Sequence, residues 1–284
     1  MALNNFIPTV WSARILQNLQ KALVFGSDAV INTDFEGEIR QMGDTVVINS
    51  IGAVTVSNYT KNTNLSDPET LSDGSMNLLI NQAKSFNFQV DDIDKAQAKP
   101  KVIDEAMREA GYALADALDQ YIAGLYTDVA TANLIGTTAS PKTDLATAGK
   151  PYQYLVELAT KLDENNVPRM GRFVIIPPWF NAYLLQDTKF LAATPQGDNR
   201  LEQGLVGKAA GFDVFMSNNV INTSSTKYRI VAGYKGAWSM AMQLNQVEAY
   251  RPEKRFADAV KGLQLYGAKV TRPTGLACLT ANPT

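Results

Sequence analysis

The sequence contains no histidine among its 284 residues. Histidine is the commonest metal ligand and the side chain that titrates nearest neutral pH, so its absence excludes histidine-based catalytic triads and most zinc sites. The phosphate-binding motif GxxxxGK[ST] is also missing, because Gly207-Lys208 is followed by Ala209. Neither GxGxxG nor GxSxG occurs. These absences predict no enzyme activity and no cofactor.

Cysteine, long apolar runs and net charge are scarce as well. The single Cys278 excludes an internal disulfide, and no apolar run approaches the length of about 20 residues that a membrane-spanning helix needs. The first residues lack a charged segment followed by an apolar one, which predicts no signal peptide, a reducing cytoplasm and no membrane partner. Lys plus Arg number 26 and Asp plus Glu 28, so a net charge of −2 provides no basic field for tight nucleic-acid binding.

An almost wholly polar tract, residues 59–75, stands between two segments that read as long strands, 44–57 and 76–90. In the second segment Phe86 and Phe88 alternate with polar residues, which is typical of a strand with one buried face. The pattern predicts an outstretched β-hairpin with the polar tract at its tip.

The acidic cluster Asp91, Asp92 and Asp94 follows the second of these segments. Carboxylates in such a cluster are compatible with a metal site. Aspartates at a strand end that precede a helix more often cap its free N–H groups, and capping is the interpretation that the sequence favours.

Spacing of apolar residues predicts the helices. Residues 6–25 suggest a short N-terminal helix, and the mixed polarity of 26–43 suggests an extended arm rather than core. Residues 101–130 give the strongest helical pattern. Its apolar stripe consists of Ile103, Met107, Ala110, Leu114, Ala117, Tyr121 and Leu125.

The later half alternates helices and strands, which predicts an α+β fold. We expect a helix near 152–165, a strand at 172–177, a helix at 179–187, a polar loop at 188–203 and a strand at 212–217. A series of short strands separated by turns follows, at 228–233, 236–242, 247–251, 263–272 and 276–280.

An isolated two-stranded hairpin is marginally stable, because its apolar face has nothing to bury against. The sequence offers no obvious second layer for it, so we expect another copy of the chain to cover the hairpin and the protein to be an obligate oligomer. The alternative is that both strands join the main sheet and the polar tract is an ordinary loop.

The order of these parts resembles the major capsid proteins of tailed bacteriophages, with the Hong Kong 97-type fold. The motifs that carry the resemblance are "RFVIIPPWFNAYLLQDTKF", "GLVGKAAGFDVFMSNNV" and "LYGAKVTRPTGLACL". The resemblance implies an N-terminal arm (1–43), an extended loop (44–92), a peripheral domain with a spine helix (93–149), an axial domain (150–232) and return strands of the peripheral domain (233–284).

The resemblance also implies function and partners. It predicts a structural subunit that self-assembles, as hexamers and pentamers, into an icosahedral shell around double-stranded phage DNA. Assembly would take place in the bacterial cytoplasm, with a separate scaffolding protein, a portal and, in some relatives, a decoration protein. Intersubunit contacts are expected from Val54, Val56, Tyr59, Lys61, Asp67, Phe86 and Phe88.

Some family members cross-link a lysine of the extended loop to a neighbour's asparagine, and Lys61 lies in this region. A lysine in a polar tip is more often a solvated side chain, and spacing identifies no partner, so no cross-link is predicted. DNA would be contacted without sequence readout, through scattered basic residues such as Arg14, Lys21, Lys101 and Arg108.

Two alternatives remain open. The same fold forms encapsulin nanocompartments, and fold does not determine cargo. A cytosolic α+β enzyme or ligand-binding protein without recognisable motifs would be distinguished from a shell subunit by a failure to form particles.

Overall fold

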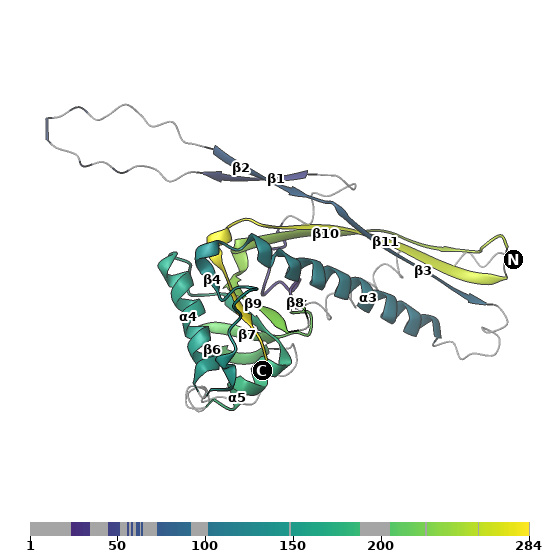
Figure 1. The fold of residues 1–284 in the computed structure, drawn as a ribbon. Coiled ribbons are helices and arrows are strands. Elements are labelled where there is room, and N and C mark those ends of the chain that lie inside the picture. Colours follow the sequence, from purple (N-terminus) through teal and green to yellow (C-terminus); the bar gives the residue numbers. More distant parts are fainter. Residues whose placement is uncertain are drawn as a thin grey trace.

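The computed structural model describes residues 24–34, 45–51, 56, 58, 61–62, 64, 73–91, 102–147, 149–187, 205–224, 226–254 and 256–283. One long helix lies along a narrow sheet, a compact lobe adjoins one end of this unit, and a two-stranded hairpin extends away from it (Figure 1). Helices and strands occur together in both the elongated unit and the lobe, which confirms the predicted α+β class.

The narrow sheet has the order β10–β11–β3, with all strands antiparallel. Its strands are β10 (Trp238–Tyr250), β11 (Ala257–Val270) and β3 (Gln82–Asp91). The prediction of separate short strands at 236–242 and 247–251 was wrong, because both belong to β10. A register shift between Leu244 and Gln246 accommodates the extra residue, so the polar stretch that suggested a turn stays in the ladder.

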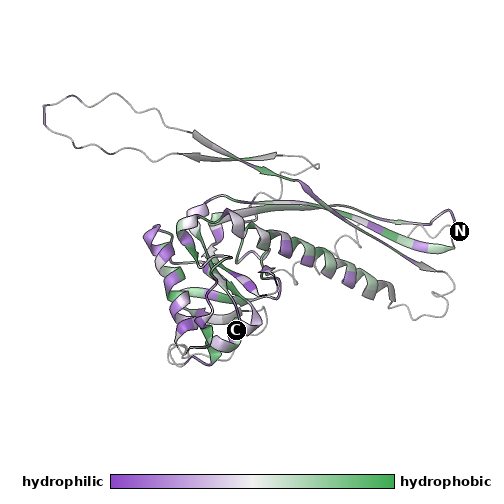
Figure 2. Cartoon of the chain, viewed as in Figure 1, coloured by the Kyte–Doolittle hydropathy of each residue, from purple (hydrophilic) through white to green (hydrophobic). Residues whose placement is uncertain are grey.

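The long helix α3 spans Val102–Gly124 and continues as a 3-10 turn, η2 (Leu125–Asp128). This confirms the helix predicted for 101–130, but its buried side is rotated from the predicted stripe. Leu118 and Ile122 are fully buried, whereas Tyr121 is only partly buried. Side chains of the sheet, of residues 25–31 and of the compact lobe all join one core with α3, which therefore buries more than a single row. Figure 2 shows hydrophilic and hydrophobic residues alternating along the helix, as an amphipathic helix requires.

The compact lobe is built on a seven-stranded sheet with the order β4–β12–β9–β5–β7–β6, to which β8 is attached through β9. Its strands are β4 (Leu134–Ile135), β5 (Arg172–Ile176), β6 (Leu205–Ala209), β7 (Phe212–Met216), β8 (Asn222–Thr223), β9 (Lys227–Tyr234) and β12 (Leu276–Ala281). The helices are α4 (Lys150–Glu164) and α5 (Pro178–Leu185), and short 3-10 turns are η3 (Thr131–Asn133), η4 (Asp144–Ala146), η6 (Lys235–Ala237) and η7 (Pro273–Gly275).

Strand β5 explains why the lobe is compact. All five of its residues are buried, as expected for the continuous apolar run that predicted it. Val174 and Ile176 belong to the core with α4 and α5, while Phe173 and Ile175 belong to the core that reaches α3. The helices at 152–165 and 179–187 and the strand at 212–217 are confirmed, and β6 was not predicted.

Backbone pairing links segments that the resemblance assigned to different domains. β12 lies within the segment 233–284, which the resemblance assigned to the return strands, but it pairs with β9, most of which lies in the predicted axial segment 150–232. β4 lies within 93–149 and pairs with β12, and both of these segments were assigned to the peripheral domain. Such long-range pairing leaves no mark in local periodicity. The naming of the peripheral and axial domains otherwise stays a prediction.

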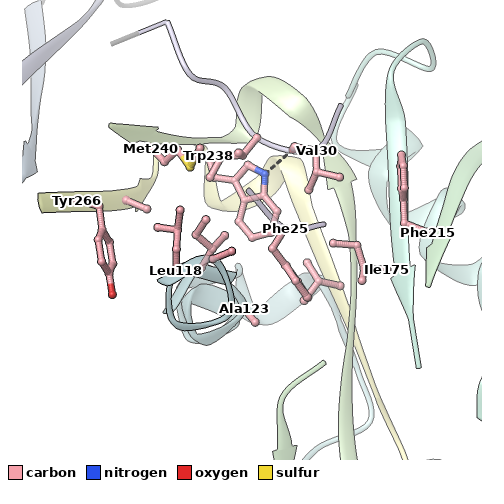
Figure 3. Close-up of a cluster of buried hydrophobic side chains, with 14 of the residues drawn as sticks. Phe25, Val30, Leu118, Ala123, Ile175, Phe215, Trp238, Met240 and Tyr266 are labelled. Carbon is pink, nitrogen blue, oxygen red and sulfur yellow. Dashed lines mark hydrogen bonds between the residues drawn. The ribbon is translucent and has the colours of Figure 1, made fainter. Parts of the chain in front are cut away.

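The prediction that residues 26–43 form an arm outside the core was wrong for the part that the structure describes. Val30 and Ile31 are fully buried, and the Nε1–H of Trp238 donates a hydrogen bond to the Val30 carbonyl at 2.7 Å. Figure 3 shows Phe25 and Val30 beside Trp238, within the cluster that also contains Leu118 and Ile175. Of the helix predicted for 6–25 the structure describes only residues 24 and 25, which lie in a turn. The loop at 188–203 and the carboxylates of Asp92 and Asp94 lie outside the described residues.

Candidate assembly interface

The hairpin consists of β1 (Thr45–Ile51) and β2 (Asp73–Leu79), which pair antiparallel from Thr45↔Leu79 to Ile51↔Asp73. This confirms a hairpin, although the last residues of the polar tract, 73–75, belong to β2 rather than to the connection. The second predicted strand, 76–90, was wrong as a single element, since it divides at Ile80 and Asn81 into β2 and β3. β3 leaves the hairpin and pairs with β11 over ten residues, so the alternative that the strands join a larger sheet is correct for this part.

The inner face of the hairpin is anchored on the chain itself. Leu78 and Ile80 are fully buried and form a small core with Ala241 of β10 and Leu265 of β11. Ile48 of β1 packs against the same cluster. The base of the hairpin therefore has a second layer within its own subunit, which the sequence did not reveal.

Hydrogen bonds and one close backbone approach fix the position at which the hairpin crosses the narrow sheet. The Nζ of Lys269 donates a hydrogen bond to the Asn77 carbonyl at 3.0 Å, and the Tyr121 hydroxyl donates one to Oδ1 of Asn81 at 3.3 Å. Gly267 of β11 lies directly against the Leu79 carbonyl, where a Cβ atom would overlap with the backbone. The absence of a side chain at this position allows β2 to approach β11 closely.

The opposite face of the hairpin is open. Adjacent residues of a strand face opposite sides, so Leu79 and Val47 lie on the face opposite to Leu78 and Ile48. Val47 is 54% exposed and Leu79 is 53% exposed. Beyond β1, Val56 is 93% exposed, and Lys61 is exposed as well. Val47, Leu79 and Val56 therefore present apolar surface that the described residues leave exposed.

Phe86 and Phe88 differ from the other predicted contact residues. Both lie on β3 and pack, partly buried, against the core that contains α3, with their rings stacked 6.0 Å apart. The ring of Phe86 also covers Gly262, its cross-strand partner on β11. The expectation that a neighbouring copy provides most of their burial was therefore wrong; a contact of their exposed edges with a neighbour stays a prediction. Val54, Tyr59 and Asp67 lie outside the described residues.

Two further exposed aromatic side chains were not singled out from the sequence. Phe256, beside the turn that joins β10 to β11, is 84% exposed, and Tyr112 on α3 is 59% exposed. The charged run "RPEKR" before Phe256 indicates a solvent-exposed turn. An aromatic residue directly after such a turn could therefore have been predicted from the sequence to be exposed.

The described residues contain no group of three or more His, Cys, Asp or Glu residues that could hold a metal ion. The thiol of Cys278 is buried, and burial raises its pKa to about 12, so it is a poor nucleophile. Within the same residues no helix is long and apolar enough to cross a membrane.

Comparisons with known proteins agree with this arrangement. The family described as phage capsid protein matches residues 78–279, more than half of the chain. A solved structure from Mycobacterium phage Che8 is 29% identical, with a TM-score of 0.68 and coverage of 98% of both chains. The capsid of cyanophage P-SCSP1u is 20% identical, with a TM-score of 0.71 and coverage of 93% of this chain and 90% of that one.

The SrpI encapsulin of Synechococcus elongatus PCC 7942 is 14% identical, with a TM-score of 0.59, and covers 86% of this chain and 84% of its own. At that identity the likeness shows the fold alone. No curated protein matches the chain. The match over most of the sequence, on a fold shared with solved capsids, shows that the chain belongs to the phage capsid protein family and is a shell-forming structural subunit with the Hong Kong 97-type fold.

Proposed function

We propose that each copy of the chain lays the outer face of its hairpin on a neighbouring copy, and that this contact joins subunits into the hexamers and pentamers of an icosahedral shell. One observation carries the proposal: the hairpin is anchored by its inner face at Leu78 and presents Val47 and Leu79, both about half exposed, on the other. Apolar side chains on a projecting element gain free energy when a partner covers them.

The distal part of the hairpin extends this contact. Val54, Val56, Tyr59, Lys61 and Asp67 are the proposed contact residues of the tip, with the exposed edges of Phe86 and Phe88 beside the base. Each contact is weak by itself, but a shell repeats it in every subunit, so many weak contacts give a stable particle.

The shell would enclose double-stranded phage DNA and contact it weakly, without sequence readout. The net charge of −2 favours weak contacts from scattered basic side chains over sequence readout. Arg108 is exposed on α3, whereas Arg14, Lys21 and Lys101 lie outside the described residues. We infer a purely structural role without catalysis, and assembly in the bacterial cytoplasm with a separate scaffolding protein, a portal and, where present, a decoration protein.

A shortened hairpin tests the proposal. Because Ile51 and Asp73 pair directly, residues 52–72 can be replaced by Asn-Gly, the two-residue connection that hairpins prefer. The shortened chain should fold, since the anchoring core at Leu78 and Ile80 is kept. It should not form shells. A second variant keeps β1, β2 and the full length of the tip, but replaces residues 59–70 with glycine and serine. It removes the proposed contacts of Tyr59, Lys61 and Asp67, so it should fold and assemble less well than the wild type.

Circular dichroism and thermal melting report folding, and sedimentation with electron microscopy reports shells. Normal shells from the shortened chain would contradict the contacts proposed for the tip. Normal shells at the wild-type protein concentration from Leu79→Ser would contradict the contact proposed for the outer face. The encapsulin-like alternative is tested on wild-type particles produced during infection: protected double-stranded DNA after nuclease treatment indicates a genome-containing capsid, and particles filled with protein indicate a nanocompartment.

A further inference from the structure

Asp119 is a buried carboxylate on α3 that contacts two separate parts of the chain. It is 2% exposed. Its Oδ1 accepts hydrogen bonds from three successive backbone N–H groups, those of Val24 at 3.1 Å, Phe25 at 2.7 Å and Gly26 at 3.4 Å. Its Oδ2 accepts one from Nδ2 of Asn219 at 3.1 Å. Asn219 belongs to the loop between β7 and β8 of the compact lobe.

The carboxylate accepts hydrogen bonds from backbone N–H groups that would bond to backbone carbonyls in a helix or a sheet. Phe25 and Gly26 are buried and lie in a turn, where a backbone N–H without an acceptor is costly. Among the described residues no lysine or arginine forms an ion pair with Asp119. Its charge is therefore balanced by hydrogen bonds alone, and each of them matters for the position of the carboxylate.

The later half of the segment is held differently. Val30 is bound through its carbonyl to Trp238, and Nζ of Lys235 pairs with Oδ1 of Asp28 at 3.0 Å. Figure 3 shows the hydrogen bond between Trp238 and Val30 beside Phe25. Residues 24–26 share a hydrogen-bonding group with the lobe, the carboxylate of Asp119, whereas Val30 is connected to the lobe through the indole of Trp238, which stacks on Phe173 of β5 at 5.5 Å.

We propose that Asp119 is a conformational latch that couples the position of the compact lobe to the chain entering the core at Val24. The bond from Asn219 fixes the plane of the carboxylate, and that plane sets the geometry of the three bonds to residues 24–26. Movement of the 217–221 loop away from α3 frees the carboxylate to rotate and loosens its hold on this turn. Groups that share one partner are energetically coupled, and the coupling acts in both directions.

Hydrogen exchange in the isolated, full-length subunit tests the latch without reference to shell formation. In Asn219→Ala, the amides of Val24, Phe25 and Gly26 should exchange about tenfold faster, since a hydrogen bond to a charged group is lost. Asn219→Asp should accelerate them further, because a second carboxylate would face the first. Asp119→Asn should retain most of the protection, since an amide oxygen also accepts N–H bonds and Asn219 can turn its own amide.

The matched control is Asp116→Ala, one turn earlier on α3, whose carboxylate accepts an exposed hydrogen bond from Gln120 at 2.8 Å. It should leave exchange at residues 24–26 unchanged. Equal exchange in wild type, Asn219→Ala and Asn219→Asp would overturn the latch. So would an equal acceleration in Asp116→Ala, because this would indicate general loosening of α3.

Discussion

Leu78 and Leu79 are neighbours in β2 that face opposite sides of the hairpin. Substitutions at the two positions therefore test folding and assembly separately. Leu78 is fully buried in the anchoring core, whereas Leu79 is 53% exposed on the open face. Truncation of a buried leucine to alanine costs about 2–5 kcal/mol of unfolding free energy. We therefore expect Leu78→Ala to lower the stability of the isolated subunit by an amount in this range.

Leu79→Ser should have a different effect. In the subunit it changes a half-buried position, so the unfolding free energy should fall by about 1 kcal/mol, less than the loss expected for Leu78→Ala. In the shell, covering the remaining half of a leucine contributes about 1 kcal/mol per copy. Since 1.4 kcal/mol is a tenfold change in an association constant, the protein concentration needed for assembly should rise about five- to tenfold.

The assay measures both quantities on the same preparations. Urea unfolding followed by circular dichroism gives subunit stability, and sedimentation over a range of protein concentrations gives the threshold for particles. The reasoning is refuted if Leu79→Ser destabilises the subunit as much as Leu78→Ala does, or if its assembly threshold equals that of the wild type.

Three other predictions concern the core. Gly262→Ala should destabilise the subunit by about 1–3 kcal/mol, because the new methyl group overlaps with the ring of Phe86, and Phe86→Leu in the same chain should restore part of the loss in urea unfolding; equal effects with and without Phe86→Leu would contradict this contact. Burial raises the pKa of Asp119 above its usual value of 3.8, so the folded state favours the protonated carboxyl group. The stabilisation that results from this protonation should be complete below pH 3.8 and should be lost as the pH rises through the higher pKa of the folded state. Wild type should thus gain unfolding free energy relative to Asp119→Asn between pH 7 and pH 4, and a constant difference in urea titrations would disprove it. Cys278 should react with a thiol reagent only at the rate of unfolding, because its pKa is raised to about 12 by burial; rapid labelling of the native subunit would show that the β12 core opens locally.

Local patterns identified the elements that bury one clear face. The run "RFVIIP" predicted a strand, and β5 is that strand and is buried throughout. The spacing in 152–165 predicted α4, and the alternation around Phe86 and Phe88 predicted a half-buried strand, which β3 is. These predictions succeed because helix and strand periodicities depend on neighbours within a few residues.

The candidate interface was predicted only in part. A polar tract between two apolar strands indicated a hairpin, and its open face carries Val47 and Leu79. The sequence could not show that β2 and β3 separate at Ile80 and Asn81, because the same alternation suits a hairpin partner and a sheet partner equally well. The pairing of β3 with β11 across more than 160 residues decided the matter.

The sequence by itself determined the kinds of elements, their order and the lack of histidine chemistry, since these follow from composition and local spacing. The tertiary structure alone decided that Val30 and Ile31 enter the core, that β12 joins the compact sheet, and that Asp119 meets both Phe25 and Asn219. A mixed-polarity segment is buried when distant groups supply its partners, as the Trp238 indole does for the Val30 carbonyl. Such partners are separated from it by 94 to 208 residues, and no local pattern records which of them the folded chain brings together.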